Sequence, residues 1–190
     1  MRLSKCFSYV LAAAMIVPAG LWASQQSCQT SAPTALSNTW NFPKEATELL
    51  NSVRYRAYAV QRDSEGLARL SRSEELDWEI YSDNLTSIRH DVNKMGKDLC
   101  RLQVIRRAAL PWQQHEIDRI TPSLKALATR TQAAIELLNS HQQTFWATNF
   151  PNDMADIHAD ATRIHKSVNR EVEYAKVQSS SSTSSTSSGM

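Results

Sequence analysis

The chain has 190 residues, 42% of them hydrophobic, and its 21 lysines and arginines nearly balance its 19 acidic residues. A nucleic-acid-binding protein needs a basic surface to displace counterions from phosphates, so this balance argues against a nucleic-acid partner. The chain has only four glycines, which is too few for a phosphate-cradling loop.

The first 23 residues have the layout of a secretory signal peptide. Arg2 and Lys5 precede an apolar run over residues 7–22, and the small residue Ala23 follows it. We expect cleavage after residue 23, and therefore a secreted, periplasmic protein without a stable membrane span. The alternative is that this segment is retained as an anchor. Cleavage would remove two basic residues and leave a mature chain that is formally neutral.

Two cysteines remain after cleavage, because Cys6 lies in the signal. Cys28 falls in an N-terminal arm, residues 24–42, that we expect to be flexible, whereas Cys100 falls in a predicted helix. An oxidising compartment permits a Cys28–Cys100 disulfide if the two Cα atoms come within about 7 Å. The sequence leaves open whether the two cysteines pair.

Apolar residues recur at alternating spacings of three and four in four consecutive segments, which is typical of amphipathic helices in a bundle. The first stripe comprises Ala46, Leu50, Val53, Ala57, Val60 and Leu67. The second, the clearest, comprises Trp78, Tyr81, Leu85, Ile88, Val92, Met95, Leu99 and Leu102. The third comprises Ile117, Ile120, Leu124, Leu127, Ala134, Leu138 and Phe145, with Thr131 and His141 in two of its positions. The fourth comprises Met154, Ile157, Ala161, Ile164, Val168, Val172 and Ala175.

Local signals mark where these helices begin. The tripeptide Asn-Phe-Pro occurs at residues 41–43 and again at 149–151, and we interpret both copies as helix starts. Ser71 and Glu74 have the spacing of a capping box, which predicts that a long second helix begins there. Pro111 suits the first turn of the third helix, since proline lacks the N–H that would be unpaired at that position.

We predict an all-α, antiparallel up-down-up-down four-helix bundle over residues 43–177, because the connections between the stripes are short. The second and third helices should be the long ones, and the third should continue through a kink at Pro122. A spacing near 3.5 predicts coiled-coil-like packing, with the stripes inside a monomer. The serine- and threonine-rich tail, residues 178–190, cannot bury apolar surface and should be disordered.

No catalytic or cofactor-binding motif stands out, so we expect neither enzyme activity nor a bound cofactor. His158 and His165 are weak candidates for metal ligands, because ligands on one helix are usually three or four residues apart rather than seven. Histidines at the surface or at the edge of the core are the simpler interpretation. His141 has an expected core position between Leu138 and Phe145, where an imidazole could act as a pH-sensitive group.

The segments His90–Gly96 and Pro111–Gln114 resemble those of uncharacterised secreted bacterial helical proteins. The resemblance implies a secreted helical bundle over most of residues 43–177, and it implies no activity. We therefore expect a structural or protein-interaction role in the cell envelope, with another envelope protein as the partner. The alternative is a periplasmic bundle that binds a small ligand or a metal, near Pro122 or at the two histidines named above.

Overall fold

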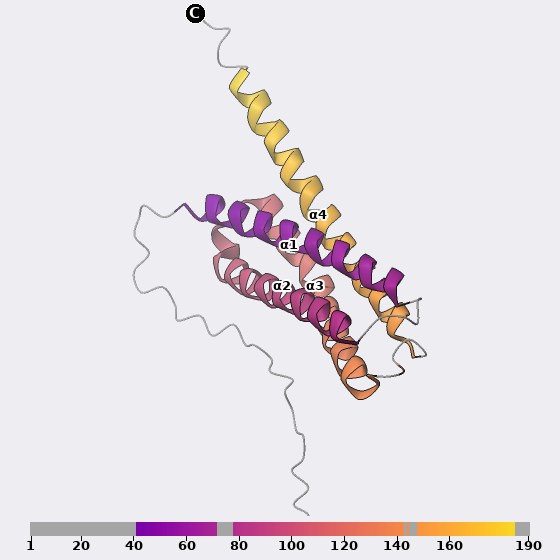
Figure 1. The fold of residues 1–190 in the computed structure, drawn as a ribbon. Coiled ribbons are helices and arrows are strands. Elements are labelled where there is room, and N and C mark those ends of the chain that lie inside the picture. The colour runs from indigo at the N-terminus through magenta and orange to yellow at the C-terminus, as the bar shows by residue number, and fades with distance from the viewer. Residues whose placement is uncertain (1–40, 72–77, 143, 145–147, 185–190) are drawn as a thin grey trace, which may run out of the picture.

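A computed structural model describes residues 41–71, 78–142, 144 and 148–184. Within these ranges the chain forms four α-helices and a short 3-10 helix (Figure 1). The elements are α1 (Phe42–Leu70), α2 (Trp78–Ile105), η1 (Arg106–Ala108), α3 (Pro111–Ser140) and α4 (Phe150–Ser184). None of these described helices is long and apolar enough to cross a membrane. The predicted all-α class is confirmed.

The helices pack as antiparallel neighbours that close into a bundle (Figure 1). Both α1 and α3 pack against α2 and α4. Polar pairs across the seams run in reversed order, so that residues late in one helix meet residues early in the next. These pairs are Glu45–Arg101 and Arg56–Asp91 for α1 and α2, and Arg119–Glu171 and Arg130–Asp160 for α3 and α4. The predicted up-down-up-down arrangement is therefore confirmed.

The four predicted stripes form the core. The stripe residues on α1 and those from Tyr81 to Leu102 on α2 are at most 6% exposed, and removing this apolar area from water is the main force that holds the bundle together. Trp78 and Ala175, at the ends of their stripes, are half-buried. At the end of the bundle where α4 begins, the ring of Tyr81 meets that of Phe150 edge-on, with 5.8 Å between the centroids.

Hydroxyl groups occupy two of the core positions. Ser64 Oγ donates to the Val60 carbonyl at 2.6 Å, and Thr131 Oγ1 donates to the Leu127 carbonyl at 2.8 Å. Each hydroxyl therefore donates its hydrogen bond to a carbonyl in the preceding turn of its own helix. A polar residue is tolerated within the apolar stripe because its hydrogen-bonding group has a partner.

The two Asn-Phe-Pro tripeptides begin α1 and α4, as predicted. The side chain of Asn41 accepts a hydrogen bond from the Lys44 N–H at 3.0 Å and caps α1. The carbonyl of Asn149 accepts from the N–H of Asp153 at 3.0 Å and opens α4. α3 begins at Pro111, also as predicted, and continues through Pro122 to Ser140 as one helix.

The prediction that the second and third helices are the long ones is wrong for the described residues. α4 has 35 residues, whereas α1, α2 and α3 have 29, 28 and 30. Ser71 ends α1 rather than starting α2, because its N–H donates to the Leu67 carbonyl. Glu74, the other half of the predicted capping box, lies outside the described residues.

α4 continues past Gln178, where the composition predicts a disordered tail, and extends to Ser184. Neither proline nor glycine occurs between Pro151 and Gly189 to interrupt it. Each residue added to an existing helix fixes one residue and gains one hydrogen bond, so an established helix extends easily. Residues 185–190 lie outside the described part of the chain.

His141 is exposed and ends α3, so the prediction that it occupies the core is wrong. Its backbone N–H donates to the Leu137 carbonyl, and its ring Nδ1 lies 2.8 Å from Ser140 Oγ. The core position does not form because the helix stops one residue earlier. Phe145, the next residue of the predicted stripe, lies outside the described residues.

Candidate functional site

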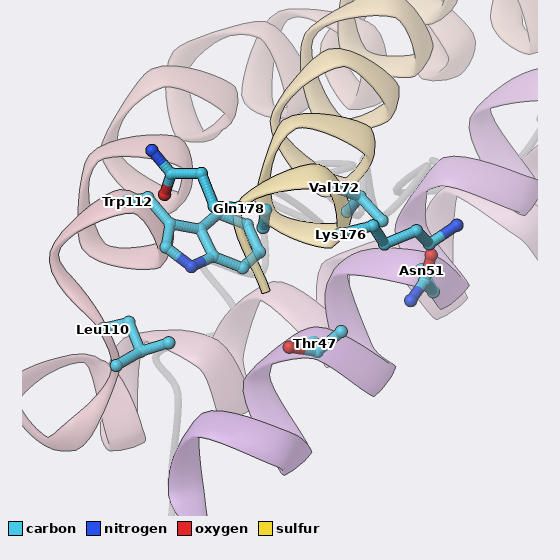
Figure 2. A pocket seen from close by; sticks show the side chains of 8 residues that line it. Thr47, Asn51, Leu110, Trp112, Val172, Lys176 and Gln178 are labelled. Atoms are coloured by element: carbon cyan, nitrogen blue, oxygen red, sulfur yellow. The ribbon is translucent and has the colours of Figure 1, made fainter. Parts of the chain in front are cut away.

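α4 is the longest of the described helices, and its last turns project from the bundle (Figure 1). A groove lies between this end of α4 and the starts of α1 and α3 (Figure 2). The groove has a volume of about 540 Å³ and is open to solvent. Its lining residues come from α1 (Thr47 and Asn51), from the start of α3 and the residue before it (Trp112 and Leu110), and from α4 (Val172, Ala175, Lys176 and Gln178). Figure 2 shows the Trp112 indole beside Gln178, with Asn51 and Lys176 together on the other side. We call these eight residues the α4 groove.

A buried glutamine, Gln113, holds two of the lining residues of the α4 groove, Leu110 and Thr47. The side chain of Gln113 is fully buried, and its Oε1 accepts from the Leu110 N–H at 2.8 Å. Its Nε2 donates to the Pro43 carbonyl at 2.7 Å and to Thr47 Oγ1 at 2.9 Å. One amide thereby joins the first turns of α1 and α3, and the groove is largely pre-formed.

The projecting part of α4 carries exposed apolar side chains. Tyr174 is 60% exposed and Val177 is 65% exposed. Glu173 anchors the helix just before them, because its carboxylate lies 2.8 Å from Lys176 Nζ and 3.5 Å from Nη1 of the mostly buried Arg54 on α1. The hydrogen bond from Lys176, aided by Arg54, holds the pKa of Glu173 below its usual value. Among the described ion pairs, Glu173–Arg54 is the one closest to the C-terminal end of α4 that joins this helix to another.

Two buried carboxylates lie between α3 and α4, and their environments differ. Asp160 accepts from Arg130 Nη1 at 2.7 Å and from Arg163 Nη1 at 3.0 Å, so it is well satisfied. Glu116 has no hydrogen bond at either oxygen, although Arg119 Nη1 lies 3.6 Å from one of them. Burial raises the pKa of Glu116, against the opposing effects of the nearby Ser167 hydroxyl and of Arg119.

His158 and His165 lie on the seam between α1 and α4, and each ring contacts a different carbonyl of α1. His158 Nδ1 lies 3.0 Å from the Gln61 carbonyl oxygen, and His165 Nδ1 lies 3.2 Å from that of Arg54. Because a carbonyl oxygen only accepts, Nδ1 of each ring carries the hydrogen. The two histidines therefore make separate contacts between α4 and α1, two helical turns apart. Among the residues that the structure describes, no group of three His, Cys, Asp or Glu side chains could hold a metal ion.

A smaller hollow of about 380 Å³ lies beside Pro122, where α2 faces α3. Arg106 and Asp118 form an ion pair at its edge, and the hydrogen bond from Arg106 lowers the pKa of Asp118. Pro122 has no N–H to offer the Asp118 carbonyl one turn back, so a backbone acceptor is freed near the hollow.

Cys100, on α2, is half-buried and disulfide-bonded. Cys28, its predicted partner, lies outside the described residues, so this pairing stays a prediction.

The sequence patterns missed the buried polar residues that shape this part of the molecule. Gln113, Glu116 and Asp160 flank the stripes, and periodicity does not distinguish a covered flank from an open one. The side chain of Gln113 accepts from the Leu110 N–H three residues earlier, but a leucine at the N-cap has no side-chain oxygen, so the sequence shows no capping box there.

Comparison of the chain with protein-family models, with curated proteins and with solved structures finds no match. The resemblance to secreted bacterial helical proteins therefore stays a prediction, and any functional conclusion rests on the geometry above.

Proposed function

We propose that the chain is a secreted, non-catalytic interaction module of the cell envelope that binds an apolar segment of another envelope protein in the α4 groove. The observation that carries the proposal is the end of α4, which lines a hollow with Val172, Ala175 and Gln178 and exposes Tyr174 and Val177 on the same turns. Exposed apolar surface next to a concave site is typical of protein-binding regions.

The chemistry of the α4 groove supports binding rather than catalysis. Of its eight described lining residues only Lys176 is charged, and that ammonium pairs with Glu173. The Thr47 hydroxyl donates to the Pro43 carbonyl and accepts from Gln113. The groove therefore presents apolar walls with an amide-bearing rim, which suits a partner that inserts apolar side chains and keeps polar groups outside.

Two features of the chain support the envelope location and the monomeric state that we propose. The first 23 residues have the layout of a signal peptide. The four apolar stripes are buried within one copy of the chain, so they are not available to pair with a second copy.

The alternative function, binding of a small ligand, is favoured by the size of the α4 groove. Its volume of about 540 Å³ lies within the range of small-molecule sites, which is roughly 300–1,000 Å³. Such a ligand would occupy the same surface, so a protein partner and a small molecule should compete for it.

The proposal predicts that charges in the α4 groove abolish partner binding. Ala175→Glu combined with Gln178→Glu places two carboxylates among the residues that line the groove and replaces no fully buried residue. In pull-downs from envelope fractions of the native host, we expect this variant to recover at least about tenfold less of any partner that the wild type enriches, since desolvating an unpaired charge is costly.

Arg89→Glu is the matched control, because Arg89 is exposed on α2, away from the α4 groove. It should recover the partner as the wild type does, and circular dichroism should show that both variants remain folded. Equal recovery by the groove variant and the wild type would refute the proposed site.

A further inference from the structure

The α4 groove lies at the end of the bundle where the described chain begins. The Asn41 side chain caps α1, and the Pro43 carbonyl accepts from Gln113 Nε2 at 2.7 Å. Thr47, which lines the groove, donates from its hydroxyl to the same carbonyl at 3.0 Å. Residues 24–40 therefore join α1 at a fixed point, with about 9 Å of helical rise between Asn41 and Thr47.

A disulfide ties the N-terminal part of the chain to the same end of the bundle. Cys100 on α2 is disulfide-bonded, and the two other cysteines, Cys6 and Cys28, both precede α1. Arg101, the residue after Cys100, binds Glu45 in the first turn of α1, so Cys100 lies level with the start of that helix. With either cysteine as the partner, the chain before α1 is held at this end of the bundle.

The chain between these two fixed points is long enough to reach the groove. With Cys28 as the partner, as we predict, residues 29–40 join the two points, and these twelve residues extend to at most about 40 Å. A bundle that is two helices wide is roughly 20–24 Å across. The segment is therefore able to pass over the end of the bundle, contact the groove and return to α1.

The composition of residues 24–40 suits the lining of the α4 groove. None of these residues is charged, and Leu36 and Trp40 supply two large apolar side chains four positions apart. The groove has apolar walls, and the one charged residue among those that line it, Lys176, already pairs with Glu173. An uncharged segment enters such a site without leaving a buried charge unpaired.

We propose that residues 24–40 cover the α4 groove of their own chain, with the side chains of Leu36 and Trp40 seated against Trp112 and Val172. A partner must then displace this segment before it binds. The displacement step rests on the function proposed above, whereas the contact within the chain does not. Because the segment is tied close to the groove, its effective concentration there is in the millimolar range, so that even a weak contact is populated.

Photo-crosslinking of the purified protein tests the contact, with a photoreactive phenylalanine analogue at Gln178 in the groove. No lysine or arginine occurs within residues 24–40, so trypsin leaves them in one peptide. After reduction of the disulfide, we expect a product that joins this peptide to position 178, with the new bond near Leu36 or Trp40. The absence of this product, or its formation from the same analogue at Arg89 on α2, would overturn the contact.

Paired variants test the two anchoring side chains. Leu36→Ser combined with Trp40→Ser lies outside the bundle and should lower the yield of this product at least about fivefold, because both large apolar side chains are lost. Leu70→Ser is the matched control, since Leu70 is 38% exposed at the far end of α1, and it should leave the yield unchanged. Circular dichroism should show that both variants remain folded. An undiminished yield from the double variant would show that these side chains are not the anchors.

Recovery of a partner from envelope fractions separates the contact from the proposed function. If residues 24–40 compete with the partner, the double variant should recover at least about twofold more of any protein that the wild type enriches. Equal recovery by the two proteins would rule out the displacement step. If neither protein recovers a partner while the crosslink within the chain forms, the proposed function fails and the contact stands.

Discussion

Replacing Leu99 with aspartate is expected to remove most of the stability of the bundle. Leu99 is 6% exposed and lies in the α2 stripe between Met95 and Leu102. The substitution deletes buried apolar surface and places an unpaired carboxylate in the core. The two effects together should cost about 4–5 kcal/mol, a large part of the 5–15 kcal/mol that holds a typical domain folded.

Arg89→Ala, at an exposed position of the same helix, provides the comparison. Its cost should stay within about 0.5 kcal/mol, as is usual for surface substitutions. Denaturant unfolding followed by circular dichroism measures both variants. Similar losses in the two would show that the faces of α2 are assigned wrongly.

Loss of the disulfide at Cys100 is expected to be the second large effect. Cys100 is disulfide-bonded, and if residues 1–23 are cleaved as we propose, Cys28 is the other cysteine that the chain keeps. A bond between them closes a loop of about 70 residues, and constraining so long a loop in the unfolded chain stabilises the fold by about 4 kcal/mol in the chain-entropy model. We therefore expect Cys100→Ser to lose about 3–4 kcal/mol of unfolding free energy.

A double-mutant comparison makes the pairing testable. If Cys28 and Cys100 pair, Cys28→Ser should cost as much as Cys100→Ser, and the double variant should cost no more than either. Peptide mapping without reductant should recover the two cysteines in one cross-linked fragment. Alkylation of both thiols in the untreated protein would rule the bond out.

The stripes made the fold class and the core predictable, because an apolar face must be buried and short connections leave few ways to bury four of them. The Asn-Phe-Pro tripeptides at residues 41–43 and 149–151 located two helix starts for a local reason, since a cap depends on neighbours in sequence. Helix ends were less predictable. Ser71 could have capped either of two helices, and the serine-rich stretch after Gln178 extends α4 because nothing interrupts it.

The candidate site was beyond sequence reasoning for a different physical reason. The α4 groove lies between the end of α4 and the starts of α1 and α3, and the relative course of these helices is a property of the assembled bundle. The burial of Glu116 likewise depends on which flank of α3 the next helix covers, whereas periodicity identifies only the apolar face. His158 and His165 were noticed, but their contacts with α1 carbonyls require the packed structure.

Site-specific photo-crosslinking in the native host tests the central claim most directly. A photoreactive phenylalanine analogue placed at Gln178 lies among the residues that line the groove, and the same analogue at Arg89 lies on α2. The account predicts one discrete crosslinked envelope protein from position 178 and none from position 89. A crosslink from position 178 only to residues 24–40 of the same chain, or identical products from both positions, would contradict it.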